Sequence, residues 1–117
     1  MENRHLMEVT SKTKGEAIVF YINGELTTTN SPEAQTEINE GLESAKCKLV
    51  VINVEKVDFI ASTGLRIILA LGKELQASGT ELVVCSPNKT NQSVFKMSGF
   101  SKLFSIFDTE EEALQLT

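Results

Sequence analysis

The sequence of 117 residues predicts a single α/β domain with a mixed, mostly parallel β-sheet and helices packed against it. Two short runs, 49–54 and 81–85, consist mainly of β-branched and other apolar residues, as in strands covered on both faces. Helical patterns alternate with these runs, which is typical of parallel strands joined by crossover helices. The length suits one hydrophobic core, and no linker, internal repeat or low-complexity stretch divides 1–117.

The N-terminal quarter predicts two strands, 6–10 and 16–22, joined by a turn at 14–15. The second strand is rich in β-branched and aromatic residues, which favour extended backbone. A loop rich in Thr and Asn follows over 27–31. Ser31 is a favourable N-cap residue, and Pro32 after it suits the first position of a helix.

The middle of the chain predicts helix, strand and helix. Apolar residues at i, i+4, i+8 and i+11 give the first helix one buried stripe: Ala34, Ile38, Leu42 and Ala45. The strand 49–54 follows. The next helix, 61–77, carries apolar residues on two adjacent strips and should be well buried, and Ser78-Gly79 is a helix stop.

The C-terminal third predicts a strand at 81–85, a short helix at 91–97 and a last strand at 103–107. Thr109, with Glu112 three residues later, forms a capping-box pattern for a final helix. The predicted element order is therefore ββαβαβαβα.

Charge and hydropathy exclude several kinds of partner. The net charge is -5, whereas nucleic-acid and anionic-membrane surfaces need clustered Lys and Arg. No apolar run approaches the roughly 20 residues of a membrane helix, and the polar N-terminus is unlike a signal peptide. We therefore expect a cytoplasmic protein with no nucleic-acid partner and no membrane insertion.

Residues that carry catalytic or metal chemistry are scarce. The only histidine is His5, in an expected tail, and neither a Walker A nor a G-x-G-x-x-G pattern occurs. Carboxylates do not pair at strand ends. Cys47 and Cys85 lack metal-ligand spacing, and we expect free, partly buried thiols. The sequence thus predicts a protein that is not an enzyme and holds no metal or cofactor.

The turn before the buried helix is the remaining candidate site. Partners of open α/β sheets tend to bind at the carboxyl ends of the strands, where this turn should lie. Ser62 stands where an N-cap belongs, and Gly64 would let another surface approach the first turn closely. Two interpretations are open: Ser62 is simply the cap, or it accepts a phosphate that the helix N-terminus tolerates.

The residues around this turn resemble the STAS family, which includes bacterial anti-sigma factor antagonists. Residues 59–65, Phe-Ile-Ala-Ser-Thr-Gly-Leu, resemble the Asp-Ser-Ser/Thr-Gly-Leu signature of that family. The similarity extends to 24–26, 82–85, 94–100 and 107–114, which is nearly the whole chain. It implies the STAS fold, whose element order agrees with the order given above.

The resemblance also implies a mechanism. Such antagonists, when unphosphorylated, bind an anti-sigma factor that is also a serine kinase, and so release the sigma factor for transcription. The kinase then phosphorylates the antagonist, and a serine phosphatase resets it. Residue by residue, the phosphoacceptor would be Ser62, with Thr63 as the less favoured hydroxyl.

Two departures from the family pattern concern this site. The signature Asp is Ala61 here, and the Asp that often follows 24–26 is Thr27. The alternative is therefore a STAS module that scaffolds a transport or signalling complex without phosphorylation; a nucleotide-hydrolysing enzyme ranks last, since no phosphate loop or base is present. The expected partner contacts are Thr27, Thr28, Ala61, Ser62, Thr63, Gly64 and Arg66.

For several other side chains near the turn, a structural role explains the sequence as well as a functional one. Arg66 is either a solvated helix residue or a partner for an acidic surface or phosphate. Most of the apolar residues that flank the turn (Phe59, Ile60 and Leu65) should belong to the core by strand and helix period. The group Phe95, Met97 and Phe100 should likewise be packing.

Overall fold

The computed structural model describes residues 7–43 and 46–116. They form a five-stranded sheet in the order β1-β2-β3-β4-β5, in which β1 is antiparallel to β2 and all other neighbours are parallel. The predicted α/β class and mostly parallel sheet are therefore confirmed. His5 and Ala45 lie outside the described residues. The strands are β1 (Met7–Lys14), β2 (Ala17–Leu26), β3 (Leu49–Ile60), β4 (Glu81–Cys85) and β5 (Ile106–Phe107).

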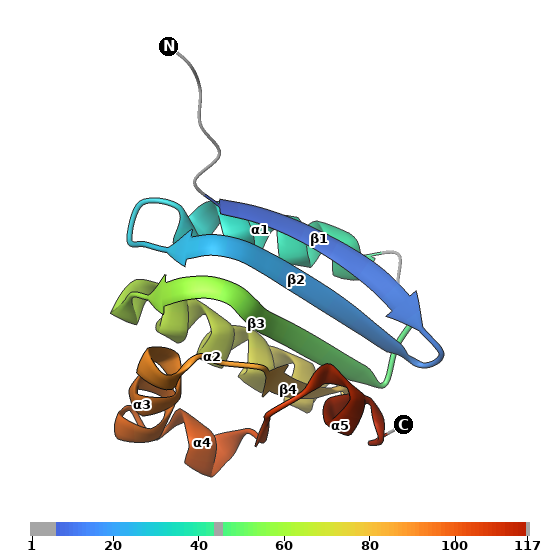
Figure 1. The fold of residues 1–117 in the computed structure, drawn as a ribbon. Coiled ribbons are helices and arrows are strands. Elements are labelled where there is room, and N and C mark those ends of the chain that lie inside the picture. The colour runs from blue at the N-terminus through green and yellow to red at the C-terminus, as the bar shows by residue number, and fades with distance from the viewer. Residues whose placement is uncertain (1–6, 44–45, 117) are drawn as a thin grey trace.

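Helices cover both faces of the sheet (Figure 1). Side chains of the first four helices pack in one core cluster with the larger apolar residues of the sheet, whereas Ala113 of α5 packs on the other face against Val19, Val51 and Val83. The alternating side chains of the central strands thus point into two separate apolar layers. The helices are α1 (Ser31–Glu43), α2 (Ser62–Ala77), α3 (Lys89–Met97), α4 (Phe100–Leu103) and α5 (Glu110–Leu114).

The C-terminal part differs from the predicted order by one extra helix. Gly99 adopts φ +84°, a left-handed conformation that ends α3 and redirects the chain into α4. Phe100 then stacks at 4.9 Å from Phe95 and 5.3 Å from Phe104, measured between ring centroids. The predicted strand over 103–107 is confirmed only at its end, because the aromatic packing holds its first residues in and after α4 and leaves two residues, Ile106 and Phe107, in β5.

β3 is longer than the predicted 49–54 and extends beyond its neighbour β4. Pairing between β3 and β4 ends at Asn53 and Cys85, whereas pairing between β2 and β3 continues to Leu26 and Ile60. The stretch 54–60 therefore has a strand neighbour on one side only. This stretch leads directly into α2, and what replaces the missing strand determines how the Ser62 turn is held.

Candidate partner-docking site

α2 begins at Ser62, and its N-cap residue is Ala61 in an extended conformation (φ -72°, ψ 162°). The prediction of Ser62 as the N-cap was therefore wrong by one position. No hydrogen bond joins the Ser62 side chain to another described residue, and the residue is exposed. A hydroxyl that caps no helix and faces solvent at a helix N-terminus is free to react or to contact a partner.

The loop between β2 and α1 is held by its own side chains. Thr27 N–H donates to Asn30 Oδ1 at 2.9 Å, and Asn30 N–H donates to Thr27 Oγ1 at 3.1 Å, a reciprocal pair of the capping-box kind. Ser31 is not the N-cap that the sequence predicts, because its hydroxyl donates to the Thr27 carbonyl at 2.5 Å and is buried. The Thr27 carbonyl accepts from both the N–H and the hydroxyl of Ser31 and so holds the start of α1.

This loop meets the start of α2. Ala61 N–H donates to the Leu26 carbonyl at 2.7 Å, and the hydroxyls of Thr28 and Thr63 lie 3.3 Å apart. Of the predicted contacts, Thr28, Ser62 and Arg66 are exposed, while Thr27, Ala61 and Thr63 are half-buried. The structure thus brings segments 35 residues apart in sequence together at one end of the sheet.

Gly64, which the sequence predicts as a partner contact, has a packing role inside the fold. It is buried, and a Cβ atom there would lie 2.9 Å from Leu26 Cβ and 3.0 Å from Ser31 Oγ. The surface that approaches Gly64 closely is therefore the chain's own β2–α1 connection. The absence of a side chain at Gly64 lets α2 pack against that connection. This packing sets the position of the first turn of α2, which contains Ser62.

Two asparagines of the α3 N-terminus hold the other side of the turn. Asn91 is fully buried; its Oδ1 accepts from Ile60 N–H at 3.1 Å and its Nδ2 donates to the Val57 carbonyl at 2.9 Å. Asn88 caps α3 and donates to the carbonyls of Val57 and Asp58. These amides satisfy the backbone groups that β4 leaves unpaired. Sequence reasoning missed both residues, because a cap-like Asn before a helix has no local sign of a distant strand partner.

A groove runs from Ser62 along α2 toward α4. Its lining combines apolar side chains, which range from buried to exposed, with small residues and one arginine: Ser62, Leu65, Arg66, Leu69, Ser98, Gly99, Phe100 and Leu103. Ile60 is core as predicted, but Phe59 is 45% exposed and Met97 is 87% exposed, against the expectation of packing. Period alone misplaces these two because Phe59 lies on the β3 overhang and Met97 is the last residue of α3.

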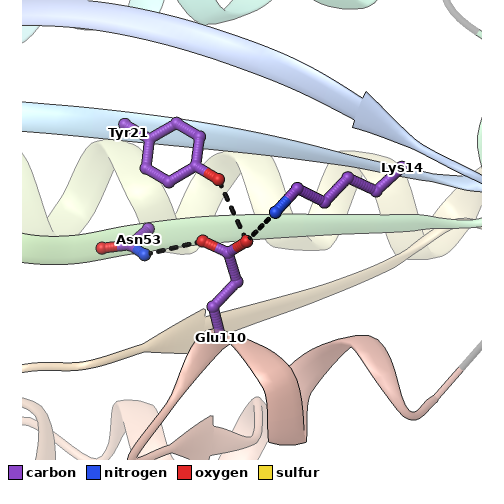
Figure 2. Close-up of polar contacts among 4 residues, drawn as sticks. All are labelled: Lys14, Tyr21, Asn53 and Glu110. Carbon is purple, nitrogen blue, oxygen red and sulfur yellow. Dashed lines mark hydrogen bonds and ion pairs between the residues drawn. The ribbon is translucent and has the colours of Figure 1, made fainter.

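A second polar cluster, which sequence reasoning did not find, fastens α5 to the other face of the sheet (Figure 2). The Glu110 carboxylate accepts from Lys14 Nζ at 2.5 Å, Tyr21 OH at 3.0 Å and Asn53 Nδ2 at 3.0 Å. Burial opposes ionisation of Glu110, but these hydrogen bonds outweigh it and lower the pKa of the carboxyl. Because every partner lies within the fold, we interpret the cluster as structural.

The remaining sequence expectations concern thiols, metals and membranes. Cys47 and Cys85 are free, and burial raises the pKa of Cys85 to about 11. Within residues 7–43 and 46–116, no group of three or more His, Cys, Asp or Glu side chains is placed to hold a metal ion. In the same ranges, no helix combines the length and apolar character needed to cross a membrane.

Comparison with known proteins identifies the family. A family model described as "STAS domain" matches residues 8–113. An anti-sigma F factor antagonist of Paenibacillus polymyxa is 29% identical over 97 residues, 83% of each chain. The fold of an anti-sigma factor antagonist from Mycobacterium paratuberculosis superposes with a TM-score of 0.84 at 22% identity, covering 94% of this chain and 92% of the other. SpoIIAA, a Bacillus cell fate determinant solved in its phosphorylated form, has a TM-score of 0.69 at 24% identity and covers 92% and 97%. The match over nearly the whole chain, together with the shared fold, places this protein in the STAS domain family.

Proposed function

We propose that this protein is an anti-sigma factor antagonist whose Ser62 turn binds an anti-sigma factor with serine kinase activity. Phosphorylation of Ser62 by that kinase releases the antagonist, and a serine phosphatase restores it. Sigma-factor-dependent transcription is thereby regulated in the cytoplasm.

The observation that carries this proposal is the free hydroxyl of Ser62. Because Ala61 occupies the N-cap position, Ser62 is the first residue of a 16-residue helix, and its hydroxyl bonds to no other residue in the described ranges. A phosphate there adds roughly -1.5 to -2 charges at pH 7, next to unpaired backbone N–H groups and the positive end of the helix dipole. The fold accommodates the modification, while a partner seated over the turn meets a new dianion.

The two substitutions relative to the family pattern leave the turn intact but less acidic. Ala61 keeps the extended conformation of an N-cap residue, and its N–H remains bonded to Leu26. Thr27 replaces a carboxylate with a hydroxyl that is committed to Asn30. A kinase that recognises this antagonist therefore meets no carboxylate at positions 27 and 61 beside Ser62.

Kinase assays and binding measurements test the proposal together. Incubation with the cognate anti-sigma kinase and ATP should place phosphate on Ser62, as mapped by mass spectrometry, and Ser62→Ala should abolish it while Thr63→Ala should not. Binding of Ser62→Asp to the anti-sigma factor should be about a hundredfold weaker, since leaving a charge desolvated and unpaired costs a few kcal/mol. Ser11→Asp, at an exposed position of β1, is the matched control and should bind normally. Phosphate that never appears on Ser62 would refute the switch.

The alternative function, a STAS module that scaffolds a transport or signalling complex, is favoured by the lost carboxylates at Ala61 and Thr27. It predicts that Ser62→Ala and Ser62→Asp both bind the partner and function in cells like the unmodified protein. The kinase assay and the pair of Ser62 variants therefore separate the two functions.

A further inference from the structure

The groove beside Ser62 is large enough to hold side chains of a partner protein. Its volume is about 200 Å³, below the roughly 300–1,000 Å³ of small-molecule pockets. Phe100 is buried, while Leu65 and Leu69 of α2 are half-buried. Leu103 of α4 is 56% exposed. The space between α2 and α4 suits one or two apolar side chains of another protein.

The parts of the sequence that form the groove contain positively charged residues and no negatively charged ones. Residues 59–73 and 82–107, which supply the whole groove, contain five cations and no carboxylate. The rest of the chain contains six cations and sixteen carboxylates. None of the five cations forms an ion pair within the described residues, and all five are exposed: Arg66, Lys73, Lys89, Lys96 and Lys102.

The groove has the exposed cation Arg66 in its lining and Lys102 next to its lining residue Leu103, on a protein whose net charge is -5, so a complementary partner is apolar and acidic. We propose that the groove binds an acidic amphipathic segment of the partner protein, with apolar side chains between Leu65 and Leu103 and carboxylates toward Arg66 and Lys102. This inference rests on the proposed function for the identity of the partner as an anti-sigma factor, but the groove and its charge stand apart from it. Acidic flanks add specificity and association rate to the burial of the apolar anchor.

The position of Arg66 connects this surface to phosphorylation. Ser62 and Arg66 both line the groove and lie four residues apart on α2, the spacing at which helix side chains meet. A phosphate on Ser62 competes with the partner's carboxylate for the Arg66 guanidinium, which binds either anion with charge-assisted hydrogen bonds. It also repels the acidic segment directly. The modification thus ejects an acidic partner by occupying the cationic site.

A peptide titration tests the surface without the natural partner. The probe is a synthetic amphipathic helix of about 18 residues, with leucines on one face and glutamates on its flanks; its control replaces every Glu with Lys. NMR of the full chain should show that the acidic probe shifts the amides of Leu65, Leu69 and Leu103. The lysine control should bind about tenfold more weakly. Lys102→Glu and Leu103→Ser should each weaken binding of the acidic probe about fivefold or more. Lys46→Glu, which changes an exposed lysine outside the groove, is the control and should leave binding of the probe unchanged.

Several outcomes would overturn the inference. Equal binding of both peptides, no shift, or shifts outside the groove would each contradict it. So would binding of phosphatidylserine vesicles or duplex DNA in preference to the acidic probe, since the cations would then serve a lipid or a nucleic acid. Failure of the proposed function looks different: the acidic probe binds the groove, but the anti-sigma factor does not bind, or binds Ser62→Asp as well as the unmodified protein.

Discussion

Replacing Asn91 with Ala should destabilise the protein through the end of β3. The substitution removes the acceptor of Ile60 N–H and one of two donors to the Val57 carbonyl. That carbonyl keeps Asn88 Nδ2 at 3.3 Å, so only the buried N–H is left without a partner. A buried unsatisfied backbone group costs about 1–3 kcal/mol, and the small void adds to this. We expect a loss of about 2–3 kcal/mol in the free energy of unfolding.

Asn91→Asp separates the two hydrogen bonds by pH. The new carboxyl keeps an acceptor for Ile60 N–H at every pH, but it donates to Val57 only when protonated. Burial and the facing carbonyl raise its folded pKa above the unfolded value of about 3.9. The variant should therefore approach the unmodified protein near pH 4. As pH rises above about 4, the free energy of unfolding of the variant should fall below that of the unmodified protein. This difference should grow by about 1.4 kcal/mol per pH unit until the pH exceeds the folded pKa of the new carboxyl.

Urea unfolding at about pH 5 and pH 8, followed by circular dichroism, measures both effects. Amide hydrogen exchange of residues 60–63 locates them, because loss of the Asn91 bonds should raise exchange at the turn more than in β4. Val83→Ala, in the core on the opposite face, is a control that lowers global stability without touching the turn. The reasoning fails if Asn91→Ala costs under about 0.5 kcal/mol, or if the Asn91→Asp deficit is the same at both pH values.

Three further predictions concern packing, pH and thiol reactivity. Gly64→Ala should cost about 1–3 kcal/mol in urea unfolding, because its Cβ would press on Leu26 Cβ at 2.9 Å; an unchanged midpoint would contradict the close packing. Glu110→Gln should lower the thermal midpoint at pH 7. Since the folded pKa of Glu110 is lowered, its stabilisation is present above the unfolded pKa and is lost as pH falls through the folded one, so the gap should close in acid. Iodoacetamide at pH 8 should modify Cys47 well before Cys85, whose pKa is raised to about 11 and whose thiol is buried; equal rates by mass spectrometry would argue against that burial.

Much of the fold was predictable because its signals are local. The apolar run at 49–54 and the apolar stripes on α1 and α2 indicate by their pattern alone which residues are buried. Ser78-Gly79 and Thr109 are residues that favour helix ends, so they indicate where α2 ends and α5 begins. Boundaries set by distant contacts were not predictable. The extension of β3 to Ile60 depends on α3, and the short β5 depends on the stacking of Phe100 and Phe104.

The site was predictable in part for the same reason. The motif at 59–65 predicted Ser62 as the centre of the site and Thr27 and Thr28 as its neighbours, and in the structure the Thr28 hydroxyl lies beside that of Thr63. The internal role of Gly64 and the bonds of Asn91 involve residues about 30 or more positions away. Nothing in the local pattern distinguishes an Asn that holds a remote strand from one that only begins a helix.

The overhang of β3 also has a consequence for the order of folding. Ser62 precedes Asn91 by 29 residues, yet the backbone before Ser62 is complete only when the Asn91 amide reaches it. During synthesis, β1 to α2 can collapse around the first core layer while the turn still lacks the hydrogen bonds from Asn88 and Asn91. The proposed docking surface is therefore completed only after α3 has left the ribosome, so a chain truncated before α3 should lack the Asn91 hydrogen bonds that hold the turn.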